Sequence, residues 1–299
     1  MEKITTFAAL VTAFKPDESV DFDAIAAQAK RQLAAGNDLF ICGTNGDFSS
    51  LTFAERVKVV ETCAAVKGNA RLIANAGFPS TYETILLAKE YQRLGVEAVA
   101  AITPYFISCT QEGLYRHYAG IADAISVPLY IYEIPARTGN SIEVATVARL
   151  ATHGNVKGIK DSSGKTERLD GLAQVCAENP GFEFFNGTDS LILYGLRKGA
   201  AGCVSGLANV APEWVRAIAQ AFESGDHDAA DAAQKKLNGL RERLYAFGYP
   251  PAMVKRALYL MDSSVGNNRL PALVPDRTID EGLKALLDDL GLKRADARL

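Results

Sequence analysis

Eight short apolar segments, each followed by a stretch with helical periodicity, dominate the sequence. Near-continuous apolar segments of this length favour parallel strands that are covered on both faces. The units follow one another roughly every 25 to 30 residues, which fits a barrel of about 250 residues made of eight strand–helix units. The predicted strands are Phe7–Val11, Leu39–Cys42, Leu72–Ala74, Ala98–Ile102, Leu129–Tyr132, Val156–Ile159, Phe182–Phe185 and Gly202–Val204.

The intervening segments carry the start and stop signals of helices. Thr52 and Glu55 have the spacing of a capping box. Gly36, Gly68 and Gly95 each stand just beyond the last periodic residue, where a left-handed residue commonly ends a helix. The predicted helices are Phe22–Ala35, Thr52–Val66, Ser80–Leu94, Gln111–Ala124, Ile142–Ala151, Thr166–Glu178, Asp189–Lys198 and Pro212–Ser224.

The order of elements predicts an α/β fold. A doubly wound open sheet is the main alternative, but it prefers a Gly-rich loop after the first strand, and Val11–Pro16 is not one. We therefore expect a (β/α)8 TIM barrel over residues 1–225. A C-terminal helical appendage over residues 226–299 should pack on the barrel, since no long linker separates the two. Its predicted helices are Asp226–Phe247, Pro251–Met261 and Thr278–Leu290.

Composition excludes several classes of protein. The 35 acidic and 32 basic residues give a net charge of −3, so no basic surface indicates a nucleic-acid partner. The apolar runs are shorter than the roughly 20 residues of a membrane span, and Met1–Thr6 lacks the apolar core of a signal peptide. Five cysteines without C-x-x-C spacing suggest neither disulfides nor zinc. We expect a cytoplasmic protein without a membrane partner.

Lys160 and Tyr132 are the first candidate catalytic residues, because active sites of such barrels lie at the carboxyl ends of the strands. A buried lysine has a lowered pKa, and its neutral amine can attack a carbonyl. The alternatives for Lys160 are an ion pair with Asp161 or a position at the rim, while Lys157 should face the other way. Tyr132 could transfer a proton, or it could be a core or rim tyrosine.

Two loops could bind an anion. Arg137 stands in a turn rich in proline and glycine, where its guanidinium could bind a carboxylate through two hydrogen bonds; the alternatives are a surface ion pair and a pair with the nearby Glu133. The loop Gly43–Gly46 could offer backbone N–H groups to a carboxylate, or its glycines could serve a tight turn.

Metal and serine chemistry find no support in the sequence. The three histidines lie far apart and have no ligand partner at helical spacing. We interpret His117 as a helix-surface residue, His153 as a C-terminal helix residue and His227 as an N-terminal one. No G-x-S-x-G motif occurs. We therefore expect no metal and no cofactor.

Three strings, taken in order, resemble the N-acetylneuraminate lyase and dihydrodipicolinate synthase superfamily of class I aldolases. They are the loop Gly43–Asp47 (GTNGD), the loop Tyr132–Gly139 (YEIPARTG) and the strand Gly158–Asp161 (GIKD). The family patterns are G-T-[TN]-G-[ED], Y-x-x-P-x-x-[TS]-G and G-[IVL]-K-[DE]. Each string alone is weak, whereas their order and spacing together are specific, and the similarity covers nearly the whole chain.

The resemblance implies a role for five residues. Lys160 would form an imine with C2 of pyruvate or another 2-oxo acid, and Tyr132 would move protons. The backbone amides of Thr44 and Asn45 would hold the carboxylate, with the Thr44 hydroxyl bonded to Tyr132. The Val204 carbonyl would lie close to the bound pyruvate. The resemblance also implies a homotetramer, a dimer of dimers, to which the apolar string Tyr105-Phe106-Ile107 would be suited as a contact surface.

Departures from the family pattern leave the reaction open. Phe106 replaces the second relay tyrosine of the synthases, Glu133 replaces an asparagine, and Asp47 replaces a glutamate. Arg137 matches the synthases, in which it binds the carboxylate of the aldehyde, whereas neuraminate lyases usually lack it. We predict a Schiff-base-forming lyase that acts on pyruvate or a 2-keto-3-deoxy acid and an aldehyde. The alternatives are a 4-hydroxy-tetrahydrodipicolinate synthase, a dehydratase of keto-deoxy sugar acids on the same lysine, and a catalytically inactive binding protein.

Overall fold

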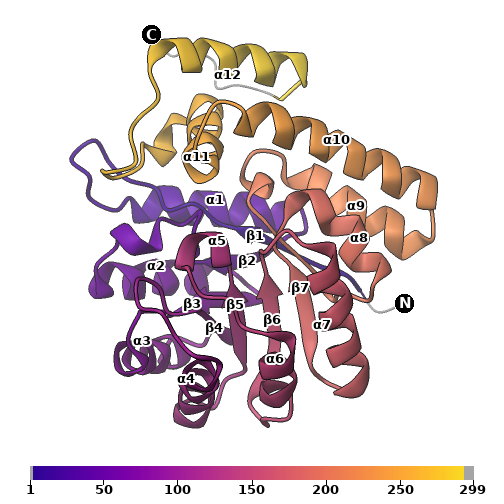
Figure 1. Cartoon of the computed structure of the whole chain (residues 1–299). Helices are drawn as coiled ribbons and strands as arrows, with labels where there is room; N and C mark the ends of the chain where they lie inside the picture. Colours follow the sequence, from indigo (N-terminus) through magenta and orange to yellow (C-terminus); the bar gives the residue numbers. More distant parts are fainter. Residues whose placement is uncertain (1–2, 293–299) are drawn as a thin grey trace.

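The computed structural model describes residues 3–292 and contains a closed barrel of eight parallel strands (Figure 1). Each strand pairs with the next in sequence order, and β8 pairs with β1 to close the barrel. The predicted TIM barrel is therefore confirmed. The strands are β1 (Thr5–Ala9), β2 (Asp38–Ile41), β3 (Leu72–Asn75), β4 (Ala98–Ile102), β5 (Leu129–Glu133), β6 (Val156–Asp161), β7 (Glu183–Asn186) and β8 (Gly202–Ser205).

Helices surround the barrel and shield the outer face of its strands (Figure 1). The predicted capping box of Thr52 and Glu55 is present at the start of α2. The helices are α1 (Phe22–Ala34), α2 (Phe53–Val66), α3 (Thr81–Arg93), α4 (Gln111–Ala124), α5 (Pro135–Thr138), α6 (Val144–Ala151), α7 (Thr166–Glu178), α8 (Ile192–Arg197) and α9 (Pro212–Ser224).

Two predicted helices begin two or more residues later than the sequence periodicity indicated. The predicted helix Ile142–Ala151 begins at Val144, because the backbone N–H of Ile142 donates to a carboxylate oxygen of Glu133 and is held outside the helix. The predicted helix Asp189–Lys198 is divided into a 3-10 turn and α8. The buried carboxylate of Asp189 accepts hydrogen bonds from the β8 end of the barrel, which fixes this first turn to the barrel.

The C-terminal segment forms three further helices, α10 (His227–Tyr245), α11 (Pro250–Met261) and α12 (Arg277–Asp289). Helix α10 packs along α9, and α11 and α12 lie over the barrel end at which the strands have their carboxyl ends (Figure 1). The domain division at residue 225 remains a prediction, and residues 293–299 of that predicted region lie outside the described residues. None of the described helices has the length and hydropathy needed to cross a membrane.

The register of β5 and β6 sets which residues face the barrel interior. Tyr132 is paired with Lys160, and Glu133 is paired with Asp161. Because side chains alternate along a strand, the first pair faces the interior and the second faces the helices outside. Lys157 is exposed, as predicted for a residue on the opposite face from Lys160.

Candidate active site

A cavity of about 150 Å³ lies at the carboxyl ends of the strands. Strands β5, β6 and β8, the loop after β2 and the short helix α5 each contribute side chains to it. All six residues predicted for the site line this one cavity: Thr44, Asn45, Tyr132, Arg137, Lys160 and Val204.

Lys160 is buried at 4% exposure, with its Nζ against two aromatic rings. Nζ lies 4.1 Å from the ring centroid of Phe40 and 3.9 Å from that of Tyr132. Burial lowers the pKa of the amine to about 7, and the negative charge of Asp189 opposes this shift only in part. A large fraction of the amine is therefore neutral at neutral pH, as a nucleophile requires.

Both alternative interpretations of Lys160 are wrong. The residue is not at an exposed rim, and its neighbour Asp161 is engaged elsewhere, with Arg168 at 3.3 Å and with the hydroxyl of Ser163 at 2.7 Å. Gly187 is needed beside it, since a Cβ there would overlap Ser162 Oγ and lie 3.1 Å from Lys160 Cε.

Tyr132 lies at the base of the cavity, and its hydroxyl is 2.7 Å from the Thr44 hydroxyl, with either group able to donate. The ring is buried and meets Phe40 edge to face, with centroids 5.6 Å apart. Burial raises the pKa of the phenol to about 12, while the hydrogen bond with Thr44 lowers it in part. The phenol is therefore protonated at neutral pH and oriented by one fixed partner.

The loop after β2 has an unusual backbone conformation. Cys42 and Asp47 have φ angles of 53° and 51°, a region that non-glycine residues seldom adopt. The Cys42 carbonyl accepts from the Asn75 side chain, and the Gly46 carbonyl accepts from the Thr12 hydroxyl. Contacts from two other strand ends thus hold this loop in a strained shape, a common feature of binding sites.

Asp47 connects this loop to the C-terminal helices. Its carboxylate accepts from Lys255 Nζ of α11 at 3.0 Å and from Asn268 Nδ2 at 2.9 Å. Lys255 is 1% exposed and its Nζ lies 4.1 Å from the ring centroid of Phe14. Burial lowers the pKa of Lys255, and Asp47 opposes that shift. We call Asp47, Lys255 and Asn268 the loop clamp; sequence reasoning missed its two C-terminal members.

We predict that Lys255→Met lowers the free energy of unfolding by about 3 kcal/mol, because it leaves the carboxylate of Asp47 buried beside an apolar chain. Urea unfolding followed by circular dichroism measures this change. The matched control is Lys58→Met. It breaks the ion pair of Lys58 with Glu61, in which both side chains are exposed, and it should lower the free energy of unfolding by less than about 1 kcal/mol. Equal losses in the two variants would contradict a buried clamp.

Arg137 is exposed, and its guanidinium carbon lies 4.3 Å from the ring centroid of Tyr249. The alternative of a pair with Glu133 is wrong, because Glu133 is buried and binds Arg168 at 2.6 Å. Burial raises the pKa of Glu133, although Arg168 opposes the shift. Arg137 therefore retains its polar N–H groups for a ligand, and Tyr249 is a cavity neighbour that sequence reasoning missed.

Asp189 and His117 differ from what the sequence suggested. Asp189 lines the cavity and is buried, with bonds from the Ser205 hydroxyl and the Leu207 N–H, and burial raises its pKa. Its place in the polar string after the seventh strand was the available signal. His117, predicted on a helix surface, is buried and bonds the Thr81 hydroxyl at 2.8 Å; burial lowers its pKa to about 4.

The apolar string before α4 reaches solvent. Phe106 is 99% exposed with a φ angle of 72°, and Ile107 is 53% exposed. Position 106 therefore carries no hydroxyl, and its side chain does not line the cavity of its own chain. Within residues 3–292, no group of three or more His, Cys, Asp or Glu side chains is arranged to hold a metal ion.

Comparison with known proteins gives consistent matches over nearly the whole chain. The model of the dihydrodipicolinate synthetase family matches residues 3–290. A protein of Halobacterium salinarum described as an uncharacterized DapA-like lyase is 38% identical over 285 residues, which cover 95% of this chain and 92% of that one. A 4-hydroxy-tetrahydrodipicolinate synthase of Hyphomonas neptunium is 36% identical over 286 residues, covering 95% and 97% of the two chains.

Solved structures match equally well. The chloride-inhibited dihydrodipicolinate synthase from Acinetobacter baumannii, complexed with pyruvate, has a TM-score of 0.91 and 31% identity to this chain. The match covers 97% of this chain and 99% of that one. The barrel and the C-terminal helices therefore belong to one shared architecture.

Proposed function

Because this chain belongs to the dihydrodipicolinate synthetase family, we propose that it is a lyase that forms a Schiff base between Lys160 and pyruvate or a 2-keto-3-deoxy acid. The observation that carries the proposal is the Lys160 amine, which is buried against two aromatic rings with its pKa lowered to about 7. No ion pair holds this amine within the described part of the chain. A neutral amine in a cavity is the nucleophile that imine formation needs.

The reaction begins when the lysine nitrogen attacks C2 of the 2-oxo acid. The nitrogen loses a proton, the carbonyl oxygen gains one, and the resulting carbinolamine loses water to give a protonated imine. Tyr132 is the group that passes protons at this step, since its phenol is held by Thr44 and its ring contacts the Lys160 amine. A phenol with a pKa near 12 serves as a donor that regains its proton readily.

Carbon–carbon bond formation or cleavage then uses the imine as an electron sink. Loss of a proton from C3 gives an enamine, whose C3 attacks the aldehyde carbon while the aldehyde oxygen takes a proton. Water hydrolyses the new imine, which releases a 4-hydroxy-2-oxo acid and the free lysine. Cleavage is the reverse sequence, so atoms and protons balance without a cofactor.

The loop after β2 is the proposed carboxylate site. The backbone N–H groups of Thr44 and Asn45 belong to the strained loop that the clamp holds at the cavity. Consecutive N–H groups in such a loop make a concave site for an anion. The Val204 carbonyl, from β8, is proposed to lie against the bound pyruvate on the opposite side.

Borohydride trapping with pyruvate tests the proposal. Reduction should fix the imine as a mass increase on the peptide that contains Lys160. The trapping rate at limiting pyruvate should rise about tenfold per pH unit below pH 7 and level off above it, because only the neutral amine reacts and its pKa is about 7. Failure to trap pyruvate on Lys160 at any pH would refute the proposal. A trapping rate that rises only above pH 10 would show that the pKa of the Lys160 amine is not lowered.

A 4-hydroxy-tetrahydrodipicolinate synthase is the second candidate. The names of the relatives and the position of Arg137 at the cavity favour it, while Phe106 counts against it. A dehydratase on the same lysine is a third outcome of the same assays. Measuring the products formed from pyruvate with aldehydes, and from 2-keto-3-deoxy acids alone, separates the three reactions.

We predict that Arg137→Ala weakens transition-state binding of a carboxylated aldehyde by about 1.5–3 kcal/mol, because a charged hydrogen bond is lost. The measurement compares kcat/KM for that aldehyde and for its uncharged analogue. The analogue is the control and should change little. Equal losses for both would mean that Arg137 acts only by packing on Tyr249.

We also propose that the protein is cytoplasmic and works as a homotetramer, a dimer of dimers. The exposed Phe106 and Ile107 support an association surface, since single chains seldom present neighbouring large apolar groups to water. Sedimentation at micromolar concentration reports the assembly, and a 32.0 kDa species would refute it.

A further inference from the structure

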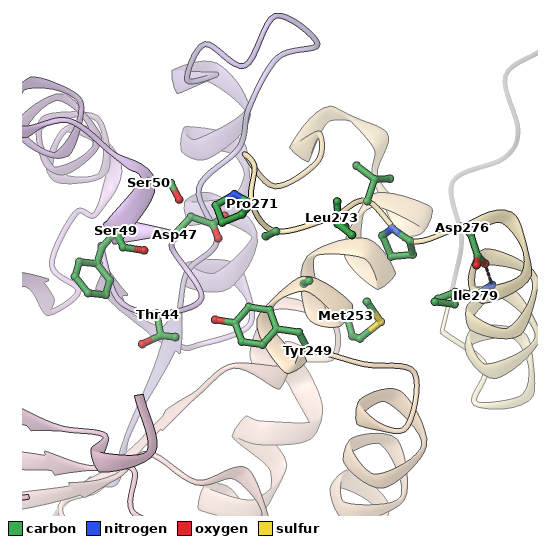
Figure 2. Close-up of a pocket in the computed structure, with 15 residues that line it drawn as sticks. Thr44, Asp47, Ser49, Ser50, Tyr249, Met253, Pro271, Leu273, Asp276 and Ile279 are labelled. Carbon is green, nitrogen blue, oxygen red and sulfur yellow. Dashed lines mark hydrogen bonds between the residues drawn. The ribbon is translucent and has the colours of Figure 1, made fainter. Parts of the chain in front are cut away.

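A second, larger cavity of about 750 Å³ adjoins the catalytic one (Figure 2). It lies between the loop after β2 and the C-terminal segment that contains Tyr249, Leu273 and Ile279. We call it the apolar groove. Thr44 lines both cavities, and Tyr249 in the groove is followed directly by Pro250 and Pro251 in the catalytic cavity. The two spaces are therefore neighbours at one wall.

The groove is lined mainly by carbon. Its walls include Phe48, Ala252, Met253, Leu273 and Val274, and two of these, Leu273 and Val274, are large apolar side chains with exposures of 74% and 48%. Exposed apolar groups that line a concave surface are typical of a ligand site.

The two charged side chains of the groove, Asp47 and Asp276, already have hydrogen-bond partners within the protein. Asp47 is held by Lys255 and Asn268, and Asp276 caps α12 by accepting from the Ile279 N–H (Figure 2). No lysine or arginine lines the groove among the described residues. The groove therefore offers no free cation for an acid group, and its uncharged polar groups are the hydroxyls of Thr44, Ser49, Ser50 and Tyr249.

The volumes of the two cavities suit two different substrates, the 2-oxo acid and the aldehyde. The catalytic cavity of about 150 Å³ suits a small 2-oxo acid on Lys160 and leaves little room for a second molecule. A bulky aldehyde needs space beside this cavity, and the groove adjoins it at Thr44. Figure 2 shows the Tyr249 hydroxyl directed toward Thr44, so this ring stands where the two spaces meet.

We propose that the apolar groove binds the hydrocarbon part of the aldehyde substrate, so that the enzyme acts on aromatic or long aliphatic aldehydes. The inference rests on the proposed function and names its substrate class. Arg137 lines the catalytic cavity and does not line the groove, so an anionic group on the same aldehyde is compatible with it.

The first experiment compares two uncharged aldehydes of equal heavy-atom count, benzaldehyde and erythrose, in carbon–carbon bond formation with pyruvate. We expect kcat/KM to be at least about tenfold higher for benzaldehyde. Leu273→Asp should reduce the benzaldehyde value about tenfold and leave the erythrose value unchanged, because burying an aryl group against a charge is unfavourable. The matched control is Leu86→Asp, which alters an exposed leucine of α3 outside both cavities. A preference for erythrose, or equal losses on both aldehydes in Leu273→Asp, would overturn the proposal.

The second experiment measures the groove without catalysis. The neutral fluorescent probe N-phenyl-1-naphthylamine should bind the wild-type protein, be displaced by benzaldehyde but not by erythrose, and bind at least about fivefold more weakly to Leu273→Asp. Unchanged probe binding in that variant would overturn the proposal that the groove is an apolar binding site, even if the enzyme is active. Probe binding that follows this pattern, together with no borohydride-trapped imine, would support the groove and refute the lysine chemistry.

Discussion

Replacing Lys160 with alanine should reduce turnover to the detection limit and abolish borohydride trapping of pyruvate. Imine formation requires the amine, and no second amine lines the catalytic cavity among the described residues. The fold should persist. Removing the amine is favourable, because burial disfavours its charged form, whereas the small cavity that remains is unfavourable. These two effects oppose each other, so we expect the free energy of unfolding to change by about 1–2 kcal/mol at most.

Turnover and thermal unfolding should be measured on the same preparations. Lys157→Ala is the matched control, since it removes a lysine from the same strand whose side chain is exposed on the other face. That variant should retain full activity. Appreciable turnover in folded Lys160→Ala would end the Schiff-base proposal, whereas loss of activity in both variants would indicate damage to β6 instead of to the chemistry.

Tyr132→Phe should lower kcat by roughly 10²–10⁴-fold while pyruvate can still be trapped on Lys160. The hydroxyl is the only group removed, and the ring that packs beside the amine remains. Without its proton transfer, the carbinolamine and the aldehyde oxygen must exchange protons with water in a buried cavity. The Thr44 hydroxyl loses its partner as well, which we expect to cost about 1 kcal/mol of stability.

The control for this variant is Tyr130→Phe, which removes another buried hydroxyl from the same strand. Tyr130 bonds Glu183 at the start of β7, away from the catalytic cavity, so its loss should alter stability and leave kcat nearly unchanged. Parent-level turnover of Tyr132→Phe across the pH range would make Tyr132 a structural residue only.

The sequence was most informative where a local pattern determines the structure. Ala98–Ile102 and Gln111–Ala124 have the predicted bounds, because an apolar run and a capped amphipathic stretch specify their own ends. The six site residues share one cavity because parallel strands place their carboxyl ends together, a property of the fold that follows once the alternation of elements is recognised.

What the sequence could not provide depends on contacts between distant residues. Lys255 and Asp47 are separated by 208 positions, and no local pattern indicates that they pair. Arg168, not Arg137, neutralises Glu133, because Glu133 points out of the barrel toward the helices. His117 carried the periodicity of a helix, but its burial depends on the neighbouring helix that supplies Thr81.

The loop clamp also has a consequence for the order in which a newly made chain becomes functional. Chains are synthesised from the N-terminus, so all eight strands leave the ribosome before Lys255 and Asn268 do. A barrel that closes on the ribosome would already enclose Lys160, yet Asp47 would lack both partners and the loop after β2 would be unanchored. We therefore expect a chain stalled before residue 255 to lack the carboxylate site that we propose for this loop, even when its eight strands are complete.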